Sequence, residues 1–302
     1  MARRIPSLRS LSCFEAAARH GSYTRAAQEL SLTQGAVSRR IASLEDFLGV
    51  ALFRRTRHGV ALTPHGLDYA RRIGGRLDGL ERDTLDAMAG QGSGGSLQLA
   101  AVPTFATRWL IPRLPDLAAR HPDIVVHLET RTRPFLFGET PFDGALYAGT
   151  PEQVARWPGT VPTLLMPEEV VPVASPARFG RGRRRRPDEL ARLPLLQQST
   201  RPEAWRQWFE AMGAECPDPT RGPRYELFSM LAHAASAGMG VALIPPMLIE
   251  RELASGELAV ICDRPLAGRR GYYLVTPETE AERPAVARFR AWLAEQVGAA
   301  PR

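Results

Sequence analysis

The sequence predicts a multidomain protein in which a helical unit ending in a β-hairpin precedes an α/β domain. Three observations support this fold class. Short helical patterns dominate residues 6–48, a long helical pattern begins at residue 64, and strand-like and helical runs alternate from residue 97 onward. A length of 302 residues with 44% hydrophobic composition is ordinary for globular protein, so each domain can bury its own core.

The positive charge of the chain is concentrated near its N-terminus. The formal net charge of the chain is +7. Residues 1–63 hold ten arginines and four acidic residues, so this segment alone has a net charge of +6. An excess of positive charge suggests a polyanionic partner. Its position indicates that the N-terminal region is the part that meets this partner.

Two short helical runs lie within residues 22–45. Ser22 and Thr33 each stand where a side-chain hydroxyl can cap the helix that follows. At 100° per residue, the second helix carries a narrow apolar stripe, which predicts its core-facing side: Val37, Ile41, Leu44 and Leu48.

The other sides of the second helix carry side chains suited to DNA. Gln34 can pair with adenine and Arg39 with guanine in the major groove, and Ser38 can serve bases or phosphates. Small residues, Gly35 and Ala42, permit close approach. An isolated polar face of this kind is usually just solvated, but the local charge favours a DNA-recognition helix. We therefore expect a helix-turn-helix from Tyr23 to Ala42.

A basic hairpin is predicted directly after these helices. Residues 51–62, ALFRRTRHGVAL, are two short apolar pieces around a turn that contains Arg54, Arg55 and Arg57. A winged helix-turn-helix uses such a hairpin to reach the DNA backbone or minor groove. The N-terminal unit is therefore predicted to be an α-helical winged helix-turn-helix.

A long helix is predicted from Pro64 to about residue 89, with Thr63 as its cap. Its apolar positions alternate in steps of three and four, which is a heptad seam: Ala70, Ile73, Leu77, Leu80, Thr84 and Ala87. We expect this seam to pair with a second copy of the chain, and the alternative is packing on its own chain. GQGSGGS, residues 90–96, has the composition of a flexible linker.

From residue 97 onward, eight strand-like runs and intervening helical runs predict an α/β fold with largely parallel sheets. Periodicity leaves open whether they form one large sheet or two lobes. The candidate strands are residues 97–102, 124–129, 142–147, 162–166, 194–198, 240–245, 258–261 and 272–277. Trp205 and Trp208 are expected in the core, and the arginine-rich run of residues 178–186 is interpreted as a solvated loop.

Several function classes find no support in the sequence. Three distant cysteines and unpaired histidines predict neither a disulfide framework nor a metal site. No nucleophile motif is present, and we expect no catalytic residues and no cofactor. The sequence contains neither a signal-peptide pattern nor an apolar run long enough to cross a membrane, so a cytoplasmic protein without membrane contact is expected.

The chain resembles a LysR-type transcriptional regulator, and most of all the branch with glycine-cleavage activators and β-lactamase regulators. The residues that carry this resemblance are the runs 14–18, 22–27, 31–55 (SLTQGAVSRRIASLEDFLGVALFRR) and 62–66 (LTPHG), together with 105–124, 237–245 and 272–293 in the second half. The branch commonly has an arginine in the segment FDGALYAG, where this chain has Leu146 and Tyr147.

The resemblance implies a winged helix-turn-helix over 1–63, a dimerising linker helix and linker over 64–92, and an effector-binding domain over 93–302. That domain would be of the type II periplasmic-binding-protein kind, with lobe I at about 93–162 and 268–302 and lobe II at about 163–267. It also implies a homodimer through the linker helix, assembled into a tetramer. The alternative is a solute-binding protein or binding-fold enzyme with a helical extension.

The resemblance further implies which residues meet the ligands. The DNA contacts would come from Thr33, Gln34, Ser38 and Arg39, with Arg55 and Arg57 on the wing. The residues expected to line an effector cleft are Thr104, Thr130, Thr132, Gln198, Ser199 and Phe228. Because Thr104 lies at a predicted helix start, where anions bind well, we expect a small anionic metabolite.

Overall fold

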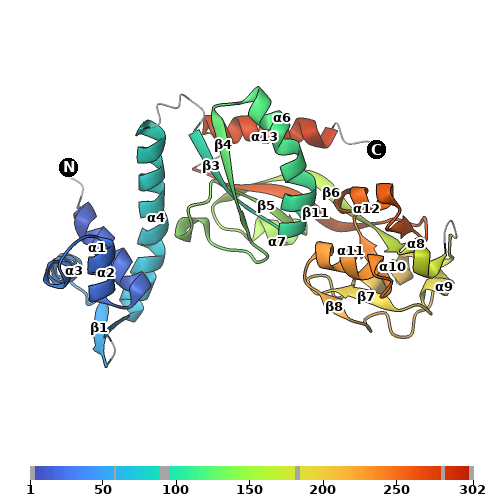
Figure 1. Ribbon diagram of the computed structural model, residues 1–302, viewed down its shortest axis with the longest axis horizontal. Coiled ribbons are helices and arrows are strands. Elements are labelled where there is room, and N and C mark those ends of the chain that lie inside the picture. The colour runs from blue at the N-terminus through green and yellow to red at the C-terminus, as the bar shows by residue number, and fades with distance from the viewer. Residues whose placement is uncertain (1–3, 58, 89–94, 181–183, 280–282, 299–302) are drawn as a thin grey trace. The chain divides into compact units, whose positions relative to one another are not determined.

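The computed structural model describes residues 4–57, 59–88, 95–180, 184–279 and 283–298, without the side chains of residues 82, 83 and 85–87 (Figure 1). They form two compact units. The first comprises Met1–Gln91 with Phe135–Phe142, and the second comprises Gly92–Pro134 with Asp143–Arg302. Residues 90–94 of the predicted linker, residues 181–183 of the arginine-rich run and the side chain of Ala87 lie outside the described part.

The first unit begins with three helices, α1 (Leu8–His20), α2 (Tyr23–Glu29) and α3 (Gln34–Leu48). Both predicted caps are present. The Ser22 hydroxyl accepts a hydrogen bond from the Arg25 amide at 3.4 Å, and the Thr33 hydroxyl accepts one from the Ala36 amide at 3.2 Å. Ser22 therefore begins α2 and Thr33 begins α3, and the short turn of residues 30–33 separates the two helices, as a helix-turn-helix requires.

The predicted apolar stripe of α3 faces the core of this unit. Val37, Ile41 and Leu44 are fully buried, and Leu48 is half-buried at the end of the helix. They pack on α1 and α2 through small and aromatic side chains that include Cys13, Phe14, Ala16, Ala17, Ala26 and Ala27. The opposite side of α3 is therefore left to solvent.

The predicted basic hairpin consists of β1 (Phe53–Thr56) and β2 (Gly59–Leu62), paired antiparallel with Arg55 opposite Val60. Its base is fixed to α3 by one carboxylate. Glu45 Oε1 accepts hydrogen bonds from the backbone amides of Leu52 at 2.6 Å and Phe53 at 3.0 Å. The hairpin and α3 consequently belong to one rigid arrangement.

The long helix α4 (Pro64–Met88) starts at the predicted cap. The Thr63 hydroxyl donates to the Ala51 carbonyl at 2.7 Å and accepts from the Gly66 amide at 3.0 Å, so it ties the helix start to the hairpin base. Gly66 lies so close to the chain that a Cβ atom there would be 2.0 Å from the Leu52 carbonyl oxygen. Only glycine fits this approach.

All eight predicted strand runs of the second unit form strands. The strands are β3 (Gly95–Ala101), β4 (Ile124–Thr130), β5 (Gly144–Gly149), β6 (Thr160–Ala174), β7 (Leu195–Gln198), β8 (Arg224–Tyr225), β9 (Val241–Ile244), β10 (Ala259–Val260) and β11 (Leu266–Pro277). Their order is β4-β3-β5-β11-β6-β9-β7-β8, with β10 on β6.

Helical segments connect and cover these strands (Figure 1). They are α5 (Pro103–Phe105), η1 (Ala106–Leu110), η2 (Ile111–Arg113), α6 (Leu114–Arg120), η3 (Phe137–Glu139), α7 (Pro151–Ala155), α8 (Pro176–Phe179), α9 (Pro187–Leu190), α10 (Ala204–Ala211), α11 (Phe228–Ser236), η4 (Pro246–Leu248), α12 (Glu250–Ser255) and α13 (Pro284–Gly298). The alternation of strands and helices confirms the predicted α/β class.

The expectation of largely parallel sheets was only partly right. β3 pairs parallel with β4 and β5, and β7 pairs parallel with β8 and β9, but β6 and β11 run antiparallel to their neighbours. The reason is topological. β6 carries the chain out of the first lobe into the second and β11 brings it back, so the two crossing strands must run in opposite directions.

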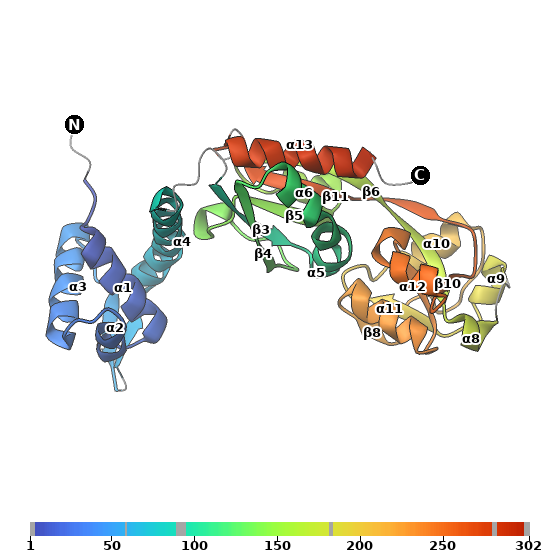
Figure 2. The same cartoon turned by 45° about the horizontal axis from the view of Figure 1, so that its top comes forward.

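β6 and β11 therefore form the hinge between two lobes, and Figure 2 shows both strands passing from one lobe to the other. Their pairing is interrupted between Ala267 and Gly271, where three residues bulge out of the ladder. Strands β3–β5 lie in the first lobe and β7–β9 in the second. The two-lobed α/β fold is thus confirmed.

Tryptophan side chains fill the second lobe as predicted. Trp205 and Trp208 on α10 are 1% and 0% exposed, and the Trp205 indole donates to the Leu196 carbonyl at 2.9 Å. In the described part of the chain, no helix combines the length and apolar character that a membrane crossing requires. The described residues also contain no cluster of three or more histidines, cysteines or acidic side chains that could hold a metal ion.

Candidate functional site

The predicted recognition residues lie on the solvent side of α3. Thr33, Gln34 and Arg39 are exposed, and Ser38 is half-buried beside the apolar stripe. Gln34 opens the helix, so its amide projects from the first turn, where recognition helices contact base edges. The side chains selected for DNA thus lie outside the buried stripe, with Gln34 and Ser38 on its flank and Arg39 opposite it.

The ends of the helix-turn-helix are fixed by packing and by the hairpin. The Tyr23 ring meets Phe53 edge-to-face at a centroid distance of 5.4 Å, and burial, followed by the charge of Glu45, raises the pKa of Tyr23 to about 12. This hydroxyl is therefore neutral at ordinary pH. Arg55 and Arg57 on the hairpin are exposed, as is Ala42 on α3.

A charged cluster joins the end of α1 to the end of α2. Arg19 donates to Glu29 at 2.6 Å and to Glu15 at 3.0 Å, and His20 contacts Glu29 at 2.6 Å. The hydrogen bond from Arg19, followed by the contact with His20, lowers the pKa of Glu29 to about 2. Glu29 therefore stays ionised and holds the two helices together at neutral pH.

A cavity of about 150 Å³ opens between the two lobes of the second unit. Four of the six predicted effector residues line it: Thr104, Thr132, Gln198 and Phe228. The other lining residues are Val102, Pro103, Phe105, Tyr147, Ala148, Gln153, Thr200, Arg201, Glu226, Leu227, Leu248, Arg270 and Tyr272. Strand ends of both lobes thus converge on one site.

The other two predicted residues, Thr130 and Ser199, are exposed beside the cavity and are not among its lining residues. Thr130 ends β4, and the Ser199 amide donates to the Tyr225 carbonyl at 2.8 Å. Gln198 and Thr200 on either side of Ser199 line the cavity, and alternation along an extended chain turns the side chain between them away. Thr130 is still paired with Ala101 in the sheet, whereas the cavity begins beyond the strand ends, at Val102 and Thr132.

Thr104 contacts the opposite lobe across the cavity. Its side chain is 5% exposed, and its hydroxyl accepts a hydrogen bond from the Ser229 amide at 3.2 Å, close to the start of α11. Thr104 therefore connects the first strand-to-helix turn of lobe I to lobe II, in addition to lining the cavity.

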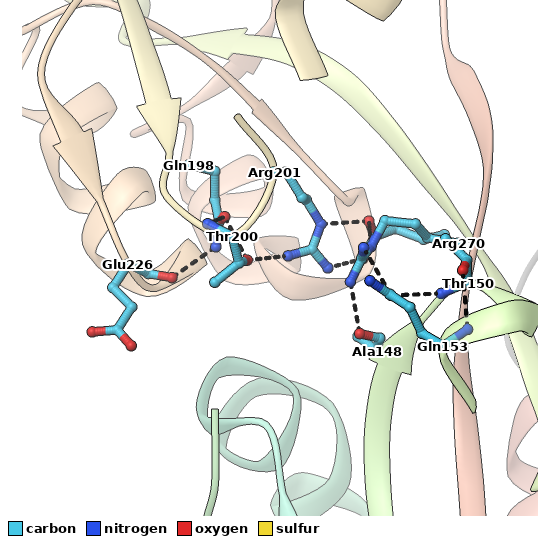
Figure 3. Close-up of polar contacts among 9 residues, drawn as sticks. Ala148, Thr150, Gln153, Gln198, Thr200, Arg201, Glu226 and Arg270 are labelled. Atoms are coloured by element: carbon cyan, nitrogen blue, oxygen red, sulfur yellow. Dashed lines mark hydrogen bonds and ion pairs between the residues drawn. The ribbon is translucent and has the colours of Figure 1, made fainter. Parts of the chain in front are cut away.

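Gln198 is held rigidly at the end of β7. Its side-chain nitrogen donates to the Glu226 carbonyl at 2.7 Å, and its side-chain oxygen accepts from the Thr200 amide and the Thr200 hydroxyl, both at 2.7 Å (Figure 3). These bonds fix the orientation of the Gln198 amide. Gln198 therefore holds the loop that follows β7 and carries Arg201.

Two arginines and a glutamate that sequence reasoning missed meet at the hinge. Arg201 donates to both oxygens of Glu168, with its Nε at 2.7 Å and its Nη2 at 2.5 Å, and its Nη1 donates to the Thr200 hydroxyl at 2.8 Å. Its guanidinium carbon also lies 4.6 Å from the centroid of the Phe228 ring. Glu168 is 4% exposed and lies behind the arginine, outside the cavity lining.

Arg270 is the second guanidinium of this cluster. Its Nη2 donates to the Ala148 carbonyl at 2.7 Å, and its Nη1 contacts the Gln153 side-chain oxygen at 3.4 Å. Burial, followed by the positive charge of Arg201, lowers the pKa of Arg270. The same surroundings raise the pKa of Tyr272 well above its usual range, first by burial and then by the charge of Glu168.

Nothing in the sequence pattern pointed to this cluster. Glu168 and Arg270 lie about a hundred residues apart on β6 and β11, and only the pairing of these two strands brings them together. Arg201 lies two residues after the predicted effector residue Ser199, and this proximity is the one signal that could have identified it.

Comparison with known proteins identifies the family of both parts of the chain. Residues 8–67 match the model of the bacterial regulatory helix-turn-helix protein, lysR family, and residues 90–298 match the LysR substrate binding domain. The chain belongs to the LysR family. This member is therefore a sequence-specific DNA-binding transcriptional regulator that a small-molecule effector controls.

Relatives of this LysR-type regulator align over nearly its whole length. It is 34% identical over 300 residues to the glycine cleavage system transcriptional activator of Escherichia coli K12, covering 99% of this chain and 96% of that protein. It is 35% identical over 289 residues to the transcriptional activator AmpR of Rhodobacter capsulatus, covering 96% of each. The effector domain of Pseudomonas aeruginosa AmpR superposes with a TM-score of 0.59 at 30% identity, covering 67% of this chain and 95% of that one.

Proposed function

We propose that this regulator reads DNA through the helix-turn-helix Tyr23–Ala42. In this proposal Thr33, Gln34, Ser38 and Arg39 meet the major groove, while Arg55 and Arg57 on the wing contact the backbone or minor groove. The observation that supports it is the division of α3 into a buried stripe and a polar face, beside an exposed arginine hairpin.

We further propose a homodimer through α4, assembled into a tetramer. The seam carries partly exposed apolar side chains: Ile73 and Leu77 are half-buried and Leu80 is 47% exposed. Pairing with a second α4 would bury them. The proposed domains are the winged helix-turn-helix over 1–63, the linker helix and linker over 64–92, and the effector domain over 93–302. Within it, lobe I spans about 93–162 and 268–302, and lobe II about 163–267.

The proposed effector is a small anionic metabolite that binds in the cavity between the lobes. Thr104, Thr132, Gln198 and Phe228 would hold it, with Thr130 and Ser199 flanking the site. Two arginines in the cavity wall supply positive charge that suits an anion. As a DNA-bound factor the protein would act in the cytoplasm, and its cavity residues would bind the effector without transforming it.

An electrophoretic mobility-shift assay with the protein's own upstream DNA tests the DNA-binding proposal. Sequence-specific retention at physiological salt is expected for the wild type and should be lost on Gln34→Ala. Arg55→Ala should weaken binding and make its salt dependence shallower, because one phosphate contact is lost.

Arg221→Ala is the matched control for charge, since it removes an exposed arginine of the second unit. Its retention and salt slope should equal those of the wild type. The proposal would be contradicted if the wild type bound random DNA as tightly as its own upstream DNA, or if Gln34→Ala bound the upstream DNA as tightly as the wild type does.

A further inference from the structure

The hinge holds three buried or partly buried charges that do not cancel. The side chains of Glu168, Arg201 and Arg270 are 4%, 11% and 23% exposed, and both arginines face the cavity while Glu168 lies behind them. Two positive charges against one negative charge leave an excess of one. A buried charge is costly unless an opposite charge or good hydrogen bonds compensate it.

Arg201 is the arginine that Glu168 neutralises. Its Nε and Nη2 each donate to a different oxygen of that carboxylate, which is the paired geometry that guanidinium and carboxylate groups prefer. Its Nη1 donates to Thr200, and its face packs on the Phe228 ring. Arg201 therefore has little need of a further anion.

Arg270 carries the uncompensated charge. Its hydrogen bonds go to two neutral acceptors, the Ala148 carbonyl and the Gln153 amide oxygen, and its Nε lies 3.7 Å from the nearer Glu168 oxygen. That Nε is buried and has no hydrogen-bond acceptor among the described residues. The site is thus short of one negative charge and has donors ready to receive it.

The nearby acidic side chains are directed elsewhere. Glu226, which also lines the cavity, is exposed, and in Figure 3 its carboxylate points away from Arg201 and Arg270. Glu152 forms an ion pair with the exposed Arg269. Solvent screens such exposed groups, so neither compensates Arg270.

The position of Arg270 explains how a hinge residue reaches the cavity. It is the last residue of the bulge between Ala267 and Gly271 on β11, and its neighbour Arg269 is 78% exposed on its side chain and absent from the cavity lining. Bulges commonly re-aim side chains beside functional sites. Arg270 lines the cavity between the lobes, whereas Arg269 lines a second cavity of about 620 Å³, which Arg270 and Glu168 also border.

We propose that the effector of this regulator is a small monoanion, a carboxylate, whose charged group binds Arg270, and that Glu168 limits the site to one negative charge by neutralising Arg201. This inference rests on the proposed effector cavity and names the charge that it accepts. A cavity of about 150 Å³ is comparable to one that holds benzene, so it suits a small ligand such as a simple carboxylate. Phosphate monoesters, with a charge near −2 at neutral pH, are disfavoured.

Isothermal titration calorimetry with pairs of simple probes tests the charge requirement in the full-length protein. The monoanions acetate, glycolate and benzoate are compared with their neutral amides, and methyl phosphate serves as the dianion. The wild type should bind at least one monoanion and should bind its amide at least tenfold more weakly. Binding of none of the monoanions, or equal binding of a bound carboxylate and its amide, overturns the proposal.

Variants of the two consecutive arginines then identify the responsible group. Arg270→Gln should weaken binding of the monoanion at least tenfold and abolish its preference over the amide, whereas Arg270→Lys should keep that preference because it retains the charge. Arg269→Gln, the matched control, should bind within about twofold of the wild type. An unchanged affinity in Arg270→Gln, or an equal loss in Arg269→Gln, overturns the proposal.

Glu168→Gln tests the limit to one negative charge. Removing this carboxylate leaves two uncompensated guanidinium groups, so the affinity for methyl phosphate relative to the bound monoanion should rise at least tenfold. If the ratio of the two affinities in Glu168→Gln equals that of the wild type, Glu168 does not limit the charge. Because both affinities are measured on the same protein, a general loss of folded protein does not change their ratio.

The failure of this inference can be distinguished from failure of the proposed function. If the protein binds its upstream DNA specifically but its cavity binds no anion, only this inference is refuted. A protein that binds monoanions through Arg270 without any DNA preference refutes the proposed DNA recognition and leaves the charge assignment standing.

Discussion

The hydroxyl oxygen of Thr104 accepts a hydrogen bond from the backbone amide of Ser229, at 3.2 Å across the space between the two lobes. Thr104 follows the first strand of lobe I, and Ser229 lies in the first turn of α11 in lobe II. A single hydroxyl therefore lines the cavity and also bridges its walls, so any movement between the lobes changes this contact.

Thr104→Val should abolish the effector response and leave DNA binding unchanged. Valine has nearly the shape of threonine but cannot accept the Ser229 amide, so the bridge is lost while the packing stays. The measurement is transcription from the regulated promoter with and without effector, together with the mobility shift of the same variant. Thr107→Val is the control, because the Thr107 hydroxyl donates only to the Pro103 and Thr104 carbonyls of the preceding turn and does not reach lobe II. A wild-type response in Thr104→Val would remove this residue from the site.

Gly66→Ala should destabilise the protein, because the new Cβ would lie 2.0 Å from the Leu52 carbonyl oxygen. Backbone cannot yield as a side-chain tip can, so we expect a loss of about 2 kcal/mol or more in the free energy of unfolding. Urea denaturation measures it. Gly79→Ala on the same helix meets nothing within 4 Å and should instead stabilise by up to about 1 kcal/mol. Equal effects of the two substitutions would contradict this account of Gly66.

Leu80→Glu should separate the dimer. A glutamate in the seam would place two like charges beside apolar side chains in the proposed α4 pair, and sedimentation velocity should then show a smaller species than the wild type does. Leu67→Glu is a close control, since Leu67 lies on the same helix off the seam and is 45% exposed against 47% for Leu80. If both variants sediment as the wild type does, the seam is not the interface.

The Glu29 cluster should make the first unit sensitive to acid. The pKa of Glu29 is lowered from 4.5 to about 2, so its contribution to stability is present above pH 4.5 and is lost as the pH falls toward 2. Thermal unfolding of Glu29→Gln should begin at lower temperature than that of the wild type at pH 7, and the difference should shrink between pH 4.5 and pH 2. Asp46→Asn, which removes an exposed carboxylate of α3, is the control. A difference that stays constant with pH would show that the cluster does not titrate as described.

Local features of the fold were predictable from sequence because they depend on neighbouring residues. The caps at Ser22 and Thr33, the stripe of α3 and the eight strand runs each follow from patterns within a few positions. The direction of β6 and β11 was not predictable in this way. It depends on which lobe each strand enters, and periodicity within a strand holds no information about that.

The candidate sites show the same difference between features set by neighbouring residues and features set by distant ones. Gln34 and Arg39 were selected from the polar sides of one helix, and six effector residues were placed by resemblance to the family, of which four line the cavity. Glu168 pairs with Arg201 through a contact between segments that are distant in the sequence. Arg270 approaches this pair because of a bulge in β11. A bulge changes which side of a strand a residue faces, so alternation along the sequence assigns such residues incorrectly or not at all.

The carboxylate of Glu45 has a consequence for how the regulator reads an operator. By binding the amides of Leu52 and Phe53, it sets the distance between the base-reading helix and the wing before any DNA arrives. In the proposed dimer, each copy would meet its half-site with the spacing between α3 and the hairpin already fixed, and would therefore lose little conformational freedom on binding. Under this proposal, an effector that alters promoter choice would act on the spacing between half-sites, and the contacts within each half-site would stay the same at every effector concentration.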